Sequence, residues 1–146
     1  MKICEPLRSN DIADTPLGPK ANGSRKGPII PLYPIDYQAQ KFTDEEHFEK
    51  IRTAKTPRNA KSLGRSRKVK IRQDWEHVKD DIMRKAVRAK FETHDDLREI
   101  LLATGDRELI ENAPRDYYWG CGALRTGKNM LGKILMEVRE QLRVDK

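Results

Sequence analysis

The sequence predicts a mainly α-helical fold, α+β at most, and three observations support this expectation. Beyond residue 37, apolar residues recur three and four positions apart in several segments, which is the period of a buried helix face. Residues that typically start and end helices flank these segments. Six of the eight prolines fall within the first 34 residues. We therefore expect an irregular N-terminal arm over residues 1–34 and a compact helical domain with a minor β element over residues 35–146.

The N-terminal arm is expected to be coil. Proline has no backbone N–H to donate and clashes with the preceding helical turn, and three glycines add conformational freedom to the same stretch. A short strand near Ile29 and Ile30 is the one regular element predicted in the arm.

Two short helices are predicted after the arm. Thr43 and Glu46 have the spacing of a capping box, so the first helix should start at Thr43. Thr56 and Pro57 suit the N-cap and first position of the second helix. Gly64 should end that helix in a left-handed C-terminal cap.

Two further helices are predicted in the middle of the chain. Asp74 is placed to cap the third helix, which should reach about Phe91. Its apolar stripe is Trp75, Val78, Ile82, Met83 and Ala86. The fourth helix should span residues 95–103 and stop at Gly105. Its inward residues are Leu97, Ile100 and Leu101.

The C-terminal region should hold a loop and the clearest helix. Residues 109–110 are expected to form a short strand or an extended piece, and residues 114–127 a loop. Asn129 is placed to cap the last helix. The stripe of that helix is Leu131, Ile134, Leu135, Val138 and Leu142. Such stripes are typical of a protein core.

Several classes of protein are disfavoured by the sequence. No apolar run approaches the ~20 residues of a membrane-spanning helix, and the first residues lack the apolar stretch of a signal peptide. The three histidines lie apart and no CxxC motif is present, so we expect no metal. The phosphate-loop and dinucleotide glycine motifs are also missing. We expect a cytoplasmic protein with no cofactor, no membrane contact and no obligate protein partner.

Positive charge is concentrated in one stretch. Residues 50–72 contain ten lysines and arginines and no acid, in a chain whose formal net charge is +7. Such a patch attracts anions, either a nucleic-acid backbone or a phosphorylated small molecule. A solvated basic surface without a ligand explains the same pattern.

The loop over residues 113–122 combines an acid, aromatic residues and glycines. Asp116 is a candidate general acid or base, Trp119 offers a plane for stacking on a nucleobase, and Gly120 lets the backbone approach a ligand. Lys128 and Asn129 then lead into a helix N-terminus, whose free N–H groups suit a phosphate. A hydrophobic plug with Asp116 capping nearby backbone is the alternative.

Two more groups of residues are candidates for binding or chemistry. Gln38 and Gln40 carry amides suited to base edges or sugar hydroxyls, and Lys41 would become a nucleophile if burial lowered its pKa. Arg65 or Arg72 could bind phosphate with two hydrogen bonds. A surface charge at Lys41 and an ordinary ion pair between an arginine and Asp74 are the alternatives.

Taken in order, these segments resemble the NADAR family, also called YbiA-like. The matching segments are residues 37–42 (YQAQKF), 51–52, 60–65 (AKSLGR), 74–79 (DWEHVK), 90–91, 101–106 (LLATGD), 109–111, 116–120 (DYYWG), 127–132 (GKNMLG) and 134–136. Together they cover roughly residues 37–143. Each segment alone is a weak signal, but the whole ordered set is a strong one.

The resemblance implies a YbiA-like helical domain with N-glycosidase activity. Members of the family act on phosphoribosylated pyrimidine intermediates of riboflavin synthesis and release ribose 5-phosphate, and others are linked to removing ADP-ribose from guanine bases. The expected partner is therefore a phosphorylated ribosyl-base small molecule, with ADP-ribosylated nucleic acid as the alternative. A family member without turnover and a basic nucleic-acid-binding module are the other interpretations of the sequence.

The resemblance also implies roles for particular residues. Lys41 matches the family's lysine, which would form an imine with the opened sugar, and Asp116 would act as acid and base. Trp119 would stack on the base. The remaining substrate-binding candidates are Gln38, Gln40, Arg65, Trp75, Gly120, Lys128 and Asn129. The pattern departs from the family where Pro34 and Ile35 replace a Glu-His pair, so acid–base chemistry at those two positions is not expected here.

Overall fold

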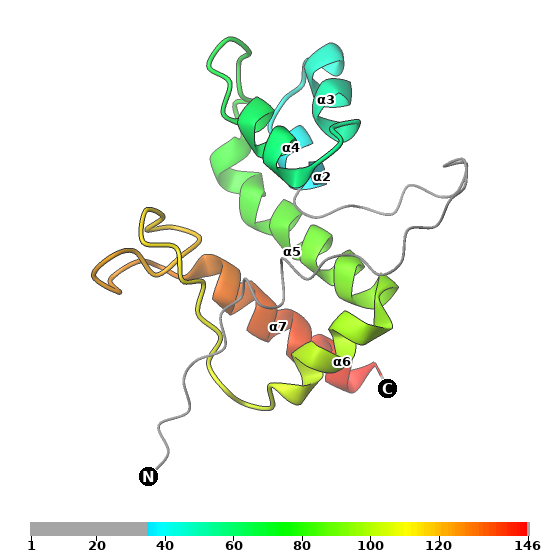
Figure 1. The fold of residues 1–146 in the computed structure, drawn as a ribbon, viewed down its shortest axis with the longest axis vertical. Coiled ribbons are helices and arrows are strands. Elements are labelled where there is room, and N and C mark those ends of the chain that lie inside the picture. The colour runs from blue at the N-terminus through cyan, green and yellow to red at the C-terminus, as the bar shows by residue number, and fades with distance from the viewer. Residues whose placement is uncertain (1–34, 146) are drawn as a thin grey trace. The chain divides into compact units, whose positions relative to one another are not determined.

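The computed structural model describes residues 35–145 and is mainly α-helical, as predicted. Its helices are α2 (Ile35–Ala39), α3 (Glu45–Arg52), α4 (Pro57–Gly64), α5 (Trp75–Thr93), α6 (Asp95–Ala103) and α7 (Met130–Val144) (Figure 1). An isolated antiparallel bridge joins Phe42 to Ile71. The predicted arm and its strand at Ile29 and Ile30 lie outside the described residues. Within residues 35–145, no helix is both long and apolar enough to cross a bilayer.

The chain divides into two compact units. Over the described residues, the first unit runs from residue 35 to residue 93 and holds α2 to α5, and the second runs from residue 94 to residue 145 and holds α6 and α7. The candidate residues are divided between them: Lys41 and Arg65 lie in the first unit, and Asp116 and Trp119 lie in the second.

In the first unit, the short helices α2, α3 and α4 lie together (Figure 1). They enclose one apolar cluster. The buried members of the cluster are Ile35, Ala39, Phe42, Ile51 and Ala60, with Phe48, Ala54, Leu63 and Val69 packed against them. These positions face inward because apolar residues removed from water provide most of the stability of such a core. Helix α2 also contacts α5.

The starts of α3 and α4 test the predicted caps. Thr43 is not the cap of α3, because Asp44 occupies that position and its carboxylate accepts a hydrogen bond from the His47 N–H at 2.8 Å. Aspartate and threonine both serve well in this role, so sequence spacing alone could not choose between neighbours. The prediction for α4 is confirmed, since the Thr56 hydroxyl accepts from the Asn59 N–H and Pro57 is the first helical residue.

The end of α4 was predicted wrongly. Gly64 does not adopt a left-handed conformation, and Arg65 follows it in a right-handed helical conformation. The reason for the glycine is space. A Cβ at position 64 would lie 2.1 Å from Gln38 Oε1 and 3.1 Å from Gln38 Cβ. Gly64 therefore allows α4 to approach α2 closely.

The longer helices follow the predicted apolar stripes with two differences. Helix α5 buries Trp75, Met83 and Ala86 as expected but continues beyond Phe91 to Thr93. Helix α6 matches its predicted bounds, and Gly105 follows it with a φ of +60°. The prediction that Ile100 faces inward is wrong, because its side chain is exposed.

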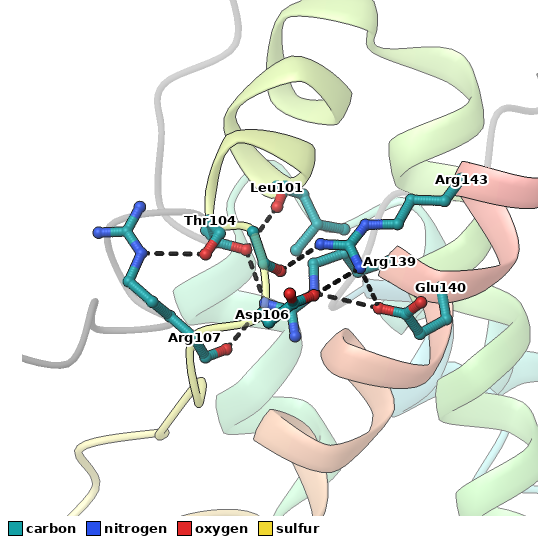
Figure 2. Close-up of polar contacts among 8 residues, drawn as sticks. Leu101, Thr104, Asp106, Arg107, Arg139, Glu140 and Arg143 are labelled. Atoms are coloured by element: carbon teal, nitrogen blue, oxygen red, sulfur yellow. Dashed lines mark hydrogen bonds and ion pairs between the residues drawn. The ribbon is translucent and has the colours of Figure 1, made fainter.

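In the second unit, α6 and α7 are joined by a polar cluster (Figure 2). Arg139 of α7 is 4% exposed, and its Nη1 donates to Thr104 Oγ1 and to the Arg107 carbonyl oxygen, both at 2.8 Å. Arg143 donates to Asp106 at 2.8 Å. Burial lowers the pKa of the Arg139 guanidinium. Because these partners lie in the residues that directly follow α6, the two arginines tie α7 to the end of α6.

Gly64→Ala should destabilise the protein, although alanine is a better helix former by about 1 kcal/mol. The added methyl group would force the Gln38 side chain aside, and overpacking of this kind typically costs about 1–3 kcal/mol. The free energy of unfolding, measured by chemical denaturation, should therefore fall.

A double-mutant cycle checks the physical cause of that loss. In a Gln38→Ala background the two closest approaches, to Gln38 Oε1 and Cδ, are removed and the 3.1 Å approach to Cβ remains, so Gly64→Ala should cost clearly less than in the parent. An equal loss in both backgrounds would show that contact with the Gln38 amide is not the reason.

Candidate functional site

Lys41 lies next to two buried aromatic rings at the end of α2. Its Nζ is 5.6 Å from the centroid of the Tyr37 ring and 5.9 Å from that of the Trp75 ring. The two rings are themselves 5.2 Å apart. The Arg72 N–H donates to the Lys41 carbonyl oxygen at 2.9 Å, which fixes the backbone here. Two elements therefore position the amine, the turn after α2 and the start of α5.

The pKa of the Lys41 ammonium is lowered from its ordinary value. Burial is the largest cause, since it disfavours the charged form, and repulsion from Arg65 and then Lys61 adds to it. An amine with a lowered pKa is unprotonated more often, and only the unprotonated amine attacks a carbonyl-like carbon. The lowered pKa of Lys41 is what the predicted nucleophilic role requires, and the role itself stays a prediction.

The two predicted glutamines do not lie together. Gln38 is buried, its side chain packs against Gly64, and its Oε1 is enclosed without a hydrogen-bond partner. Gln40 is exposed at the end of α2. Residues two apart on a helix point in different directions, which explains why Gln38 is buried and Gln40 is exposed. Gln38 is thus part of the contact between α2 and α4.

The two candidate arginines also differ. Arg72 makes an ion pair with Asp74 through Nε and Nη2, at 2.5 and 2.8 Å, as the alternative interpretation predicted. Arg65 is exposed, and its charge acts on Lys41. Arg65 is therefore the arginine placed to attract an anion close to the lysine.

Sequence reasoning missed Tyr37 and Lys61 as neighbours of Lys41. Tyr37 precedes the lysine by four residues, which is a spacing that brings side chains together on a helix. That signal was available. The proximity of Lys61 depends on the packing of α4 on α2, which no local pattern reveals.

In the second unit, Asp116 organises the aromatic loop. Its Oδ1 accepts hydrogen bonds from the Tyr118 and Trp119 N–H groups, at 2.9 and 2.7 Å. The Trp119 ring is half-buried and meets the Tyr118 ring edge to face at 5.0 Å. Lys128 Nζ lies 5.2 Å from the centroid of the Tyr118 ring. The aromatic rings, the acid and Lys128 therefore form one local group.

Gly120 and Asn129 have structural roles in this loop. A Cβ at Gly120 would lie 2.6 Å from the Ala113 Cβ, so the glycine is needed for packing within the loop. Asn129 precedes α7 in a left-handed conformation without capping it through its side chain. Its amide instead accepts from the Glu111 N–H and donates to the Leu109 carbonyl oxygen, both at 2.9 Å. The expectation that Asn129 caps the helix is corrected.

The predicted phosphate site of free N–H groups before α7 is also wrong. The Lys128, Met130 and Leu131 N–H groups donate to the carbonyl oxygens of residues 117, 118 and 119, at 2.8, 3.0 and 3.1 Å. The Asn129 N–H donates to the Gly120 carbonyl oxygen at 3.1 Å. The aromatic loop folds back onto the start of α7, so the N–H groups of residues 128–131 hold this loop in place.

The structure thus brings the candidate residues together in two groups. Lys41, Trp75 and Arg65 form one, and Asp116, Trp119 and Lys128 form the other. Over residues 35–145, no cluster of three His, Cys, Asp or Glu residues has the arrangement of a metal site.

Comparison with known proteins supplies the family context. A model of the NADAR domain matches residues 34–143. N-glycosidase YbiA of Escherichia coli (strain K12) is 51% identical over 110 residues, which are 75% of this chain and 69% of that protein. An N-glycosidase of Nostoc punctiforme is 53% identical over 110 residues, 73% of this chain and 70% of that protein.

Two further similarities extend the comparison. The chloroplastic riboflavin biosynthesis protein PYRR of Arabidopsis thaliana is 38% identical over 128 residues, 81% of this chain and 21% of that protein. The NMR structure of the E. coli protein YbiA superimposes with a TM-score of 0.72 at 50% identity. That match covers 76% of this chain but 66% of the YbiA chain, so this chain spans about two-thirds of that length.

Substitutions at Asp116 should separate its carboxylate from its structural role. Asp116→Ala removes the acceptor of two N–H groups and should lower the free energy of unfolding by about 0.5–2 kcal/mol, as for the removal of a helix cap. Asp116→Asn keeps an acceptor oxygen and should be close to the parent in stability.

Chemical denaturation of both variants measures these differences, with Asn112→Ala as a control at an exposed position just before the loop. If Asp116→Ala were as stable as the parent, the two hydrogen bonds would not hold the loop.

Proposed function

Because the chain belongs to the NADAR domain family, we propose that it is an N-glycosidase, which hydrolyses the bond between a ribose carbon and a nitrogen of a base-like ring. The observation that carries the proposal is the half-buried Lys41 amine beside the Tyr37 and Trp75 rings, with a lowered pKa. Two relatives named as N-glycosidases share about half of its residues over the matched region.

The reaction proceeds through covalent attachment of the sugar to Lys41. The ribose ring first opens as the C1′–O4′ bond breaks, O4′ takes a proton, and C1′ becomes doubly bonded to the base nitrogen. The unprotonated Lys41 amine adds to C1′, and a proton passes from this amine to the base nitrogen. The bond from C1′ to the base nitrogen then breaks, the base leaves, and the lysine retains the sugar as an imine. Water then adds to the imine carbon, and the sugar leaves as an aldehyde while the amine is restored. The net change is the addition of one water molecule across the glycosidic bond.

We propose a phosphoribosylated pyrimidine of the riboflavin pathway as the substrate. The name of the plant relative as a riboflavin biosynthesis protein supports this choice. Arg65 and Lys61 supply positive charge near Lys41 that suits the phosphate of such a substrate. Trp119 offers a surface for the pyrimidine ring, and Lys128 a second cation for the phosphate.

Acid–base chemistry must come from outside the positions of the missing Glu-His pair. Ile35 is 5% exposed and belongs to the core cluster around α2, so this position contributes packing. Pro34 lies outside the described residues, and proline has no group that titrates. We assign the acid–base role to Asp116. Both of its hydrogen bonds to the loop use Oδ1, so Oδ2 takes no part in them.

Hydrolysis of the phosphoribosylated pyrimidine tests the proposal, with release of ribose 5-phosphate as the readout. Lys41→Ala and Lys41→Arg should both lose several orders of magnitude in kcat, because neither supplies an amine that can form an imine. Reduction of the reacting parent protein with borohydride should attach the sugar covalently to Lys41, seen as a mass increase on that residue.

Lys50→Ala is the matched control, since Lys50 is exposed and paired with Glu46. Its turnover should equal that of the parent. Full turnover in Lys41→Ala would remove the imine mechanism, and absence of turnover in the correctly folded parent would remove the proposed activity.

The pH dependence of kcat/KM should report the environment of Lys41. Since the reactive form is the free amine, the rate should rise as pH increases through the pKa of Lys41, below its ordinary value of 10.5. Lys61→Gln removes one of the charges that lower this pKa, so the rising limb should move to higher pH.

Arg58→Gln is the control for that shift, because it removes the same charge from the same helix one turn earlier. Its rising limb should stay in place. A profile that Lys61→Gln leaves unmoved would mean that Lys41 is not the titrating group.

A further inference from the structure

The basic stretch over residues 50–72 contains more positive charge than the proposed reaction uses. Three of its ten cations are neutralised by acids from outside the stretch: Lys50 by Glu46, Arg52 by Glu49 and Arg72 by Asp74. The other seven are exposed, and none makes an ion pair within residues 35–145. The basic surface consists of these seven residues, Lys55, Arg58, Lys61, Arg65, Arg67, Lys68 and Lys70.

Three of these cations form a row on α4. Arg58, Lys61 and Arg65 follow at intervals of three and four residues, and at 100° per residue they fall within about 60° of the helix circumference. By the same rotation, the buried Ala60 and Gly64 of α4 lie about 90–130° from the middle of this row. All three cations are exposed, so the row faces solvent.

The loop from α4 to α5 continues the charge. Arg67, Lys68 and Lys70 follow within five residues of Arg65, in the segment that extends beyond α4 (Figure 1). The Lys68 N–H donates to Ser66 Oγ at 3.3 Å, which orders the turn. Ile71 is the exposed large hydrophobic residue in this stretch. A surface with so many cations and so little apolar area suits a polyanionic partner better than an apolar one.

We propose that the basic surface binds the phosphodiester backbone of nucleic acid. The row on α4 extends over about 10 Å at 1.5 Å per residue, while phosphates along one nucleic-acid strand repeat every ~3.4 Å of axis. A row of this length can face several phosphates of a strand. A substrate with one phosphate has too few charges to engage the row and the loop together.

Two other polyanionic partners fit less well. Stable binding to an anionic membrane normally combines basic residues with apolar side chains that enter the headgroup region, and the stretch exposes little besides Ile71. An acidic protein would be expected to use a hydrophobic core within its interface. A nucleic-acid backbone needs neither, since counterion release supplies most of the affinity.

Nucleic-acid binding by the basic surface is separate from the proposed glycosidase reaction, so a binding measurement that needs no substrate turnover can test it. Binding of fluorescently labelled 20-nucleotide RNA and DNA of one sequence, single-stranded and duplex, is measured by anisotropy over a range of KCl concentrations, with the full chain. The test variant replaces Arg58, Arg67, Lys68 and Lys70 by glutamine. None of these residues has a role in the proposed reaction.

The control variant removes equal charge from paired cations of the same unit, by replacing Lys50, Arg52, Lys79 and Arg84 with glutamine. The slope of log affinity against log salt should become shallower by about one for each phosphate-binding cation that is removed. The test variant should therefore lose as much as about four in slope and at least about tenfold in affinity at low salt. The control should keep the parent's slope.

Circular dichroism checks that each variant is folded, and Arg58→Lys/Arg67→Lys, which keeps the charges, should bind like the parent. Retention of binding in the test variant would overturn the proposal, and so would an equal loss in the control. Tighter binding to phosphatidylserine vesicles than to any of the nucleic acids, abolished in the test variant, would overturn it in favour of a membrane surface.

Discussion

Helix α2 has five residues, too few to be stable alone in water, so its position depends on the close approach of Gly64 to Gln38. Without a side chain at position 64, the backbone of α4 reaches the amide of Gln38, and the apolar cluster closes around Ile35 and Ala39. Tyr37 is then fixed against Trp75, and Lys41 follows one turn later beside both rings. The environment of the Lys41 amine is thus a consequence of helix packing.

The same packing determines which charges surround Lys41. Gly64 is next to Arg65 and one turn from Lys61, so bringing α4 onto α2 also brings these cations near the amine. Their effect would be partly cancelled by a bound phosphate, whose negative charge favours the ammonium form. Burial, the largest cause of the lowered pKa, is not cancelled in this way. Burial is therefore the cause of the lowered pKa of Lys41 that would persist beside a bound phosphate.

Local sequence rules predicted the elements well and their contacts poorly. Thr56 and Pro57 start α4, the bounds of α6 match, and the stripe of α7 is buried, because caps and apolar periods are encoded within a few residues. Gly64 and Asn129 were misinterpreted because each has a partner in a distant segment, Gln38 in one case and residues 109 and 111 in the other. The ordinary ion pair of Arg72 was foreseen as an alternative, since Asp74 is two residues away.

The backbone N–H groups at several helix starts already have hydrogen-bond partners, which bears on how a phosphate could bind. The N–H groups at the start of α7 donate to the carbonyl oxygens of the aromatic loop, and the N-cap positions of α3 and α4 are filled by Asp44 and Thr56. A carboxylate at the cap also repels an anion. The phosphate proposed to bind near Lys41 would therefore be held by cationic side chains, such as Arg65 and Lys61. A lysine acts on a phosphate as a point charge, whereas an arginine can bind it through two parallel hydrogen bonds, so Arg65 is the one of these two cations that could orient the phosphate.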